Sequence, residues 1–413
     1  MKKITIILLT IFIFMNSYSK EKYGYIDRTG KEIIKPKYEI ARYFSEGIAV
    51  VGKTIKQNGQ NRDKYGYIDK TGNEITGFIY DHADDFSEGL ACVMNEKGRH
   101  GYIDKTGKTV LPFIYDDAGE FKNGTAWVRR NENSGKALID KSGKIIFELD
   151  KNIDVCGEIR EERIMATKKE KIGYLDMSGK VVIPFKYDYG TDFINGKAVV
   201  AMNNPEHKKY ENYDANDYEE GEPYMSEYTK VIYIDKNGNK LKQKVPYVKS
   251  MLTEDYDKES PYPLMEPVHS EKKMMYGYFD ENGKNITGYI YSNADDFSEG
   301  LASVEKNGKY GFIDKNGKEV IPRIYELCYG FTEGISGVEK NGKWGYIDKT
   351  GKVVIDFKYD NIDYFRNDLA CVRIGKNAYF INKNGEKIID MSKYKKDIYC
   401  FGKEGMCKVA VDE

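Results

Sequence analysis

The chain has 413 residues, of which 32% are charged and 40% are hydrophobic, and its 65 lysines and arginines nearly balance its 66 aspartates and glutamates. Both signs of charge are spread along the sequence, so no basic face concentrates phosphate groups and we expect no nucleic-acid partner. The 35 tyrosines and 40 glycines are typical of strands joined by tight turns.

The first 19 residues differ in composition from the rest. Two lysines precede an apolar run over residues 4–15, and Ser17-Tyr18-Ser19 supplies small side chains after it. This is the pattern of a secretory signal peptide, and we expect cleavage after Ser19; an uncleaved anchor is the alternative. The run is short for a membrane span, which needs about 20 residues. We therefore expect a protein that does not span the membrane after cleavage and is periplasmic, cell-surface or extracellular.

From residue 22 onward one motif recurs, seen in full at residues 343–352 as Lys-Trp-Gly-Tyr-Ile-Asp-Lys-Thr-Gly-Lys. Most successive copies lie 34 to 36 residues apart, and self-similarity at a fixed period of this size is the mark of a repeat architecture. Ten units align on the motif aspartate or its equivalent, which are Asp27, Asp69, Asp104, Asp140, Asp176, Asp235, Asp280, Asp314, Asp348 and Asn382.

Each unit predicts three short strands. The first, Gly-Tyr-Ile-Asp, precedes a Lys-x-Gly-Lys hairpin turn, because Asp bonds its own downstream backbone and Gly accepts a positive φ. The second ends near a Pro or Gly, such as Pro112, Pro184 or Pro322, which marks a strand end or a bulge. The third, such as residues 90–93, should pair with the first strand of the following unit.

The pattern predicts an all-β fold of about ten tandem three-stranded antiparallel repeats. An open superhelical array makes no demand on the number of units, and we favour it. A propeller-like ring, or two five-unit rings, is the alternative. The chain begins with a first strand and ends with an isolated third strand, Met406 to Val411, which would complete the first unit if the array closed.

Insertions interrupt the regular spacing. We divide the chain into a signal peptide at 1–19, repeats one to five at 20–202, an acidic tyrosine-rich insert at 203–229, a divergent sixth repeat with a proline-containing insert at 230–273, and repeats seven to ten at 274–413. The insert is either a mobile acidic loop or a binding loop. Its candidate binding residues are Tyr210, Tyr213 and Tyr218.

Residues 343–352, together with Phe-Ser-Glu-Gly-Leu-Ala-x-Val in units two and seven, resemble the WG-repeat (KWG-type) family of bacterial repeat proteins. The resemblance covers nearly all of residues 22–411, although this chain usually has Tyr rather than Trp before the Gly. It implies a repeat architecture that is often found on exported or surface proteins. It supplies no catalytic residues.

Seven tyrosines recur after the Pro or Gly bend and form a ladder across the units. Aromatic residues in strands either pack side by side in a core or line a groove where their rings stack on sugars or peptide side chains. We retain both interpretations. The candidate binding residues are Tyr38, Tyr80, Tyr115, Tyr187, Tyr291, Tyr325 and Tyr359.

Other polar residues give weaker signals. The motif aspartates are turn formers rather than cation ligands, since one carboxylate per turn cannot supply the six to eight oxygens of a calcium site. The four histidines lack metal-binding spacing, so we predict no metal and no cofactor. The cysteines, including Cys156 and Cys328, fall where other units have small buried residues, and we expect unpaired thiols.

The sequence therefore predicts an exported non-enzymatic repeat protein that acts as a binding or scaffold module for a protein or glycan of the envelope or extracellular space. The alternative is a hydrolase of envelope polysaccharide that uses a carboxylate pair such as Asp84 and Glu88. The sequence leaves the partner and the oligomeric state open.

Overall fold

A computed structural model describes residues 21–57, 59–203, 228–242, 268–269, 275–278, 286–394 and 404–412. These residues form strands, turns and bends, and none of them lies in a helix that is long and apolar enough to cross a membrane. The signal-peptide prediction and the candidate tyrosines Tyr210, Tyr213 and Tyr218 lie outside the described residues.

The described strands form ten antiparallel sheets, numbered here along the array. Sheets 1 to 3 contain, in turn, β35 (Cys407–Asp412), β1 (Glu21–Ile26) and β2 (Glu32–Tyr38); β3 (Ile40–Ala41), β4 (Ile48–Gln57) and β5 (Gln60–Asp69); and β6 (His82–Ala83), β7 (Leu90–Met94), β8 (His100–Asp104) and β9 (Thr109–Tyr115). Sheets 4 to 6 contain β10 (Asp117–Ala118), β11 (Thr125–Arg129), β12 (Ala137–Asp140) and β13 (Ile145–Glu148); β14 (Asp154–Arg160), β15 (Arg163–Lys168), β16 (Lys171–Leu175) and β17 (Val181–Tyr187); and β18 (Tyr189–Gly190), β19 (Lys197–Asn203) and β20 (Tyr228–Asp235).

Sheets 7 to 10 contain β21 (Val268–His269) and β22 (Tyr276–Gly277); β23 (Asn293–Ala294), β24 (Leu301–Lys306), β25 (Lys309–Asp314) and β26 (Glu319–Tyr325); β27 (Leu327–Cys328), β28 (Ile335–Lys340), β29 (Lys343–Asp348) and β30 (Val353–Tyr359); and β31 (Asn361–Ile362), β32 (Leu369–Ile374), β33 (Asn377–Asn382) and β34 (Lys387–Asp390). The predicted class, an all-β array of tandem antiparallel units, is confirmed.

Each sheet is offset from the sequence repeat. In sheet 3, β7 is the third strand of unit two, and it pairs with β8 and through it with β9, the first two strands of unit three. The predicted pairing of a third strand with the next unit is confirmed. The two-residue strand β6, at His82 and Ala83, pairs with β7 where the sequence indicated only a connection. Most of the complete sheets thus have four strands rather than three.

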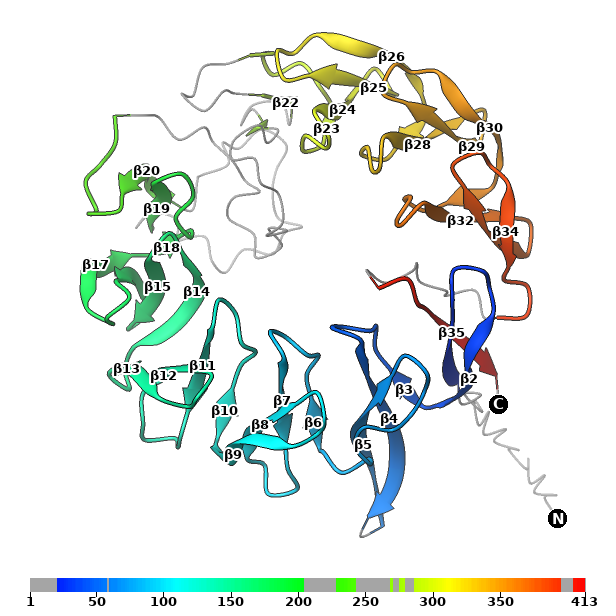
Figure 1. Cartoon of the computed structure of the whole chain (residues 1–413). Coiled ribbons are helices and arrows are strands. Elements are labelled where there is room, and N and C mark those ends of the chain that lie inside the picture. Colours follow the sequence, from blue (N-terminus) through cyan, green and yellow to red (C-terminus); the bar gives the residue numbers. More distant parts are fainter. Residues whose placement is uncertain are drawn as a thin grey trace, which may run out of the picture.

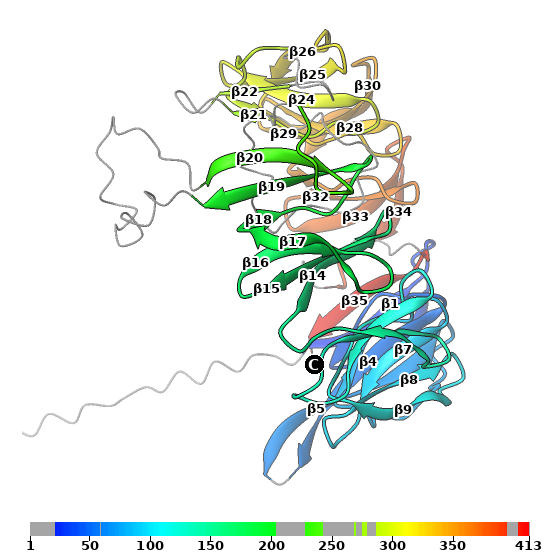
Figure 2. The ribbon, with the colours of Figure 1, turned by 90° about the vertical axis from the view of Figure 1, so that its left-hand side faces the viewer.

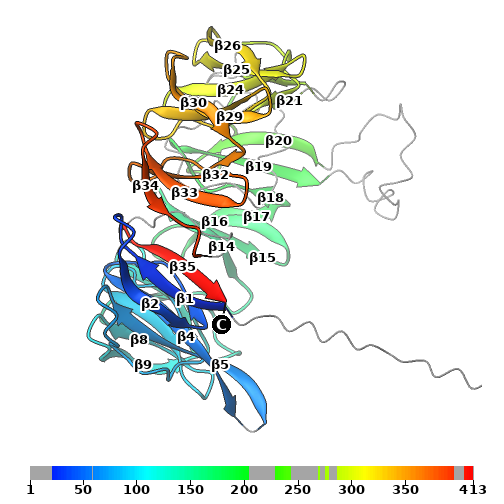
Figure 3. The ribbon, with the colours of Figure 1, turned by 90° about the vertical axis from the view of Figure 1, so that its right-hand side faces the viewer.

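The sheets follow one another around a ring, which Figure 1 shows face-on and Figures 2 and 3 show edge-on. The two-residue strand β23 lies toward the centre, and the strands that end their sheets, such as β9 and β26, lie on the outer rim (Figure 1). The insertion at residues 52–64 continues β4 and β5 as a hairpin whose last pair is Gln57 and Gln60. This hairpin projects from the ring (Figure 2).

The two ends of the chain meet in sheet 1. β35 pairs with β1 over six residue pairs, including Gly24 with Val409, and the buried Ile26 and Val409 share a hydrophobic cluster with Phe380 and Ile389 of sheet 10. The array therefore closes at its termini, and the structure has the ring rather than the favoured open array. Two five-unit rings do not occur, because β1 pairs with the last strand of unit ten. The junction between β20 and β21 lies outside the described residues.

The Asp-Lys-x-Gly turns pack each sheet against the preceding one. Asp104 Oδ1 accepts hydrogen bonds from the backbone N–H groups of Thr106 and Lys108 at 2.9 and 3.1 Å and from the Thr106 hydroxyl at 2.6 Å, which confirms its predicted role in the turn. Gly107 has a φ of +82°, and a Cβ there would lie 2.8 Å from the Thr76 side chain of the preceding sheet. The same turn in unit one brings Gly30 against Ile389, so it also closes the ring.

Ring closure is tested by placing a charge in the closing strand. Val409 is 1% exposed, and Val409→Asp buries a carboxylate without a partner, so it should lower the free energy of unfolding by about 3 kcal/mol or more. Ile388→Asp, on the outer strand of sheet 10 at 41% exposure, is the matched control and should change it by less than about 0.5 kcal/mol. Equal effects in denaturant titrations would argue for an open array.

The turn aspartates predict acid lability. Hydrogen bonds, first from the Thr71 hydroxyl, hold the pKa of Asp69 down to about 2, below the usual value of about 3.9 in an unfolded chain. A lowered folded-state pKa contributes stability that is present above about pH 4 and is lost as the pH falls toward about 2. Because Asn382 makes the same turn without titrating, Asp69→Asn should fold and should lose less stability than the parent chain between about pH 5 and about pH 3 in urea titrations. An unchanged pH dependence would contradict this.

Candidate binding surface on the inner rim

The tyrosine ladder is part of the core. Tyr38, Tyr80, Tyr115, Tyr187, Tyr291, Tyr325 and Tyr359 are 2 to 6% exposed. The Tyr80 ring stacks on Phe113 of the next unit, with centroids 6.4 Å apart, and Tyr325 stacks on Phe357 in the same way. The rings are covered by neighbouring units, which is the arrangement that the core interpretation of the ladder predicts.

A second set of tyrosines, those that follow the motif Gly, ties each sheet to the next. Tyr102 is fully buried, and its hydroxyl donates a 2.7 Å hydrogen bond to the carbonyl of Gly119, which enters the following sheet. Its ring meets Phe121 edge-on, with centroids 4.9 Å apart. The same hydrogen bond recurs in five other units, where a tyrosine hydroxyl donates to the backbone carbonyl 17 residues later at 2.6 to 2.8 Å. The pairs are Tyr25 with Arg42, Tyr67 with Asp84, Tyr174 with Thr191, Tyr278 with Asp295 and Tyr346 with Asp363.

Unit eight replaces this hydrogen bond. It has Phe312 at the tyrosine position, so the equivalent carbonyl, that of Tyr329, lacks the usual donor. The buried Ser336 hydroxyl donates to that carbonyl at 2.7 Å instead. Other units have Ala at the Ser336 position, as at Ala126 of unit three. The substitution and its compensation occur in the same unit.

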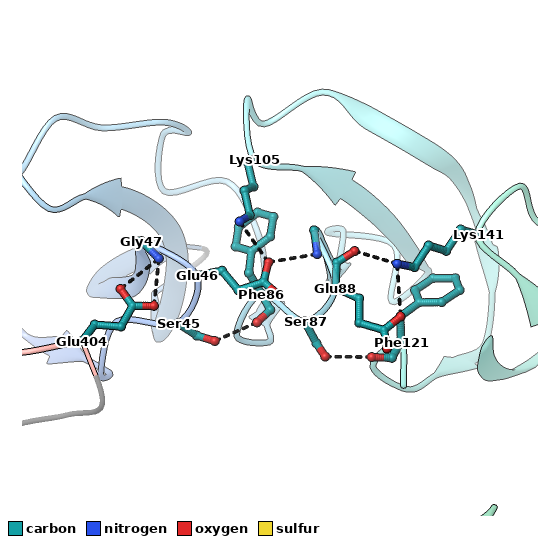
Figure 4. A network of polar contacts seen from close by, with 11 residues as sticks. Ser45, Glu46, Gly47, Phe86, Ser87, Glu88, Lys105, Phe121, Lys141 and Glu404 are labelled. Carbon is teal, nitrogen blue, oxygen red and sulfur yellow. Dashed lines mark hydrogen bonds and ion pairs between the residues drawn. The ribbon is translucent and has the colours of Figure 1, made fainter. Parts of the chain in front are cut away.

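The Phe-Ser-Glu-Gly connection forms a polar clamp between neighbouring sheets (Figure 4). Ser87 donates to the carbonyl of Phe121 at 2.7 Å. Glu88 accepts the backbone N–H of Gly124 at 2.9 Å and forms an ion pair of 3.1 Å with Lys141. A single Glu therefore fixes both a turn and a lysine of the following sheet.

The Glu clamp recurs around the ring. Equivalent contacts join Glu46 to Gly89 and Lys105, Glu161 to Gly196 and Lys236, Glu299 to Gly334 and Lys349, Glu333 to Asp368 and Lys383, and Glu404 to Gly47 and Lys70. The last of these carries the clamp across the closing junction. Glu88 has a φ of +52°, a conformation that Asn adopts more readily and that Asn123 adopts in unit three. Glu in this strained position is explained by what its carboxylate binds.

These contacts also account for the carboxylates considered as a catalytic pair. Asp84 Oδ1 lies 2.9 Å from Nε2 of His82. The hydrogen bonds from Lys141 and Gly124 lower the pKa of Glu88. Both side chains thus have partners within the array.

The inner connections are the four-residue segments that run along the central side of the ring (Figure 1): residues 41–44, 83–86, 118–121, 156–159, 190–193, 294–297, 328–331 and 362–365. Their first position is small or aliphatic and their last is Phe or Ile, whereas their two middle positions vary from unit to unit. Together they contain eight acidic residues and one basic residue, Arg42, although the whole chain is balanced. The inner connections are therefore acidic, although Lys122 and Arg160, one residue beyond them, pair with Glu120, Glu158 and Asp192.

Two middle-position acids are exposed but crowded. The Asp85 side chain is 48% exposed, and Arg42 lies 3.9 Å away. Displacement of water by the surrounding protein raises the pKa of Asp85, Arg42 lowers it, and Asp84 and Glu120 raise it again. The pKa of Asp296 is raised by the same desolvation and by Asp295. The rim thus holds carboxylates that disfavour one another's charge.

An aromatic stack lies in sheets 9 and 10. The Tyr329 ring lies between Trp344, with centroids 4.8 Å apart, and Tyr364, with centroids 4.7 Å apart. Trp344 is buried, whereas Tyr329 and Tyr364 keep part of their surface. Sequence reasoning missed both tyrosines because they do not recur in register. The sequence signal that could have identified them is that units eight and nine have Tyr-Gly and Asp-Tyr where units two and seven have Asp-Asp.

The cysteine prediction holds in part. Cys92, Cys156 and Cys328 are unpaired, as expected, and Cys400 lies outside the described residues. Cys156 is exposed rather than buried, because unit four has a bulge between Val155 and Ile159. Across the described ranges, no group of three or more His, Cys, Asp and Glu side chains is arranged to hold a metal ion.

Comparison with known proteins gives a family match. The model of the WG containing repeat matches residues 23–53, 65–98, 101–133, 172–204, 276–310, 310–344, 344–377 and 380–413, which together exceed half of the chain. No curated protein matches the sequence significantly.

Solved structures are similar at low sequence identity. BamB from Moraxella catarrhalis is 9% identical over 94% of this chain and 98% of its own, with a TM-score of 0.28. A eukaryotic initiation factor is 10% identical over 91% and 96%, with a TM-score of 0.42. The WD40 beta propeller domain of Doa1 is 9% identical over 73% and 93%, with a TM-score of 0.22.

The natural exchange in unit eight can be transplanted into unit three. Tyr102→Phe should lower the free energy of unfolding by about 1–2 kcal/mol, because the buried carbonyl of Gly119 loses its donor. Adding Ala126→Ser should restore most of that loss, since Ser336 performs this role 24 residues after Phe312. Ala126→Ser alone, in the Tyr102 background, is the control and should not stabilise. Additive effects of the two changes would contradict the exchange.

Proposed function

The chain belongs to the family of WG containing repeat proteins, and from this premise we propose that it is an exported, non-enzymatic binding or scaffold protein for a component of the cell envelope or extracellular space. The observation that carries the proposal is that structural residues and variable residues occupy separate positions within the unit. Buried tyrosines and aspartate turns recur in most units and the Glu clamp in six, whereas the middle positions of the inner connections range over Arg-Tyr, Asp-Asp, Gly-Glu, Thr-Asp, Tyr-Gly and Asp-Tyr. A constant framework that presents variable residues along one rim is what a binding module requires.

The non-enzymatic part of the proposal is supported by the contacts of the repeated acids. Glu88 is engaged by Gly124 and Lys141, and the motif aspartates accept the hydrogen bonds of their own turns. Recurrence of these residues is thus explained by assembly of the array. General acid–base catalysis instead needs a group whose proton is free to transfer within reach of a substrate.

Export is supported by the composition of residues 1–19, and location at the envelope by what the family resemblance implies. A protein partner and a glycan partner both suit a polar rim with aromatic residues.

Affinity capture from an envelope extract tests the proposal. Residues 20–413, immobilised, should retain a defined protein or glycan that elutes with excess soluble chain. Because β19 and β20 pair directly from Asn203 to Tyr228, a variant with Asn-Gly in place of residues 204–227 keeps a two-residue hairpin turn and controls for the insert. Capture of the same partner by both chains places the binding surface on the ring. Recovery of no saturable partner by either chain would overturn the proposal.

The same material separates binding from hydrolysis. If the chain hydrolyses envelope polysaccharide with the Asp84 and Glu88 pair, the Asp84→Asn plus Glu88→Gln double variant should release no reducing ends while remaining folded. A binding protein should release none in either form, and its capture should change little.

A further inference from the structure

The inner connections of sheets 8, 9 and 10 bring three kinds of side chain together. Sheet 8 contributes the exposed Asp295 and Asp296, sheet 9 contributes Tyr329 and Gly330, and sheet 10 contributes Tyr364. We call these five residues the Tyr364 patch.

Direct contacts show that the three connections touch. The Tyr329 and Tyr364 rings lie against each other, with centroids 4.7 Å apart and planes inclined by 31°. On the other side, Ser298 donates to the carbonyl of Phe331 at 2.5 Å, which holds the sheet 8 connection against that of sheet 9. The patch is therefore one continuous surface across two junctions.

Gly330 leaves this surface uncovered. Most units carry Asp, Glu or Tyr at its position, but here a Cβ would meet within 4 Å only the Ser298 side chain, at 3.4 Å. Burial, Tyr329, Asp295 and Asp363 all raise the pKa of Tyr364, and Arg366 lowers it.

The chemistry of the patch suits a cation. A tyrosine ring attracts an ammonium or guanidinium group over its face, within about 6 Å of the centroid, and adjacent carboxylates add a charge-assisted hydrogen bond. Such pairs already occur in the protein, where Lys37 and Lys186 lie 5.0 Å from the ring centroids of the buried Tyr38 and Tyr187. At the patch, two carboxylates stand beside partly exposed rings.

Charge along the rim indicates where a cation would bind. Four of the eight acids of the inner connections already pair with Lys or Arg side chains: Asp85 with Arg42, Glu120 with Lys122, Glu158 with Lys122 and Arg160, and Asp192 with Arg160. Among the described residues, no Lys or Arg forms an ion pair with Asp295, Asp296 or Asp363, so the unpaired carboxylates of the rim gather in sheets 8 and 10. A neutral glycan would stack on the tyrosines but would leave the crowded aspartates uncompensated. Charge complementarity therefore favours a basic polypeptide.

We propose that the inner rim binds a lysine- or arginine-rich segment of a partner protein, with one cationic side chain seated over Tyr364 beside Asp295. This rests on the proposed binding function and names its partner class. The contact is a cation–π pair and an ion pair formed together, and binding weakens as salt is raised.

The test is titration of residues 20–413 into a fluorescently labelled lysine/arginine-rich peptide, followed by anisotropy, beside the same peptide with glutamine at every basic position. The basic peptide should bind and the glutamine peptide should not. Tyr364→Ala, Asp295→Asn and Gly330→Gln should each weaken binding by about tenfold, which corresponds to about 1.4 kcal/mol, while Tyr364→Phe should bind as the parent does. Thermal unfolding of each variant checks the fold.

The control is Asp85→Asn on the other arc, which removes one rim carboxylate away from the aromatic stack and should weaken binding by about twofold at most. An equal loss in Asp85→Asn and Asp295→Asn, equal binding of both peptides, no binding of the basic peptide, or binding of an envelope saccharide in its place would each overturn the assignment.

Failure here is separable from failure of the proposed function. If the envelope partner is captured equally by the parent and by Tyr364→Ala, the Tyr364 patch is not the binding surface although the binding function stands. If capture from the extract is lost in Tyr364→Ala and kept in Tyr364→Phe, both inferences are supported.

Discussion

The hydrogen bond from a buried tyrosine hydroxyl to a carbonyl 17 residues later is the contact on which the array depends. It runs from the first strand of a sequence unit to the inner connection of the same unit, which belongs to the next sheet, so it sets how neighbouring sheets meet. A buried carbonyl without a donor costs about 1–3 kcal/mol, which is why unit eight, having Phe312, supplies Ser336 for the same carbonyl. The buried carbonyl requires a hydrogen-bond donor, but that donor need not be a tyrosine.

Closure follows from the offset between sheet and repeat. Because each third strand pairs with the first strand of the following unit, any linear array of such units ends with an unpaired first strand and an unpaired third strand. Exposed strand edges invite pairing with other chains. Here β1 and β35 satisfy one another, and the Glu404 clamp and the Gly30 turn repeat at this junction the contacts used elsewhere. The closing junction is thus built like the others.

Much of this was predictable from the sequence. Strand positions, the aspartate turns and the pairing between units follow from local sequence patterns that recur in each repeat. The closure of the array into a ring could not be predicted, because its curvature is the sum of small rotations between sheets, which are set by packing such as that of Gly107 on Thr76. The fate of the tyrosine ladder was ambiguous for a related reason: alternation shows that Tyr80 and Tyr325 share a side of their strands, but not that Phe113 and Phe357 of the next units cover them. Two-residue strands such as β6 are too short to show any periodicity.

The candidate site lies where repetition fails, and there is a physical reason for this. In most units the Gly, Tyr, Asp, Glu and Phe positions each serve a turn, a buried hydrogen bond, a clamp or a core contact, and in unit eight the loss of the tyrosine hydroxyl at Phe312 is compensated by Ser336. The side chains at the middle positions of the inner connections make contacts that differ from unit to unit, such as the ion pair of Asp192 with Arg160 and the stacking of Tyr329 on Trp344, so the repeat requires no single side chain there. Tyr329, Gly330 and Tyr364 occupy such positions. Binding chemistry there costs the ring little stability, which makes the least repeated residues the most informative about what this protein recognises.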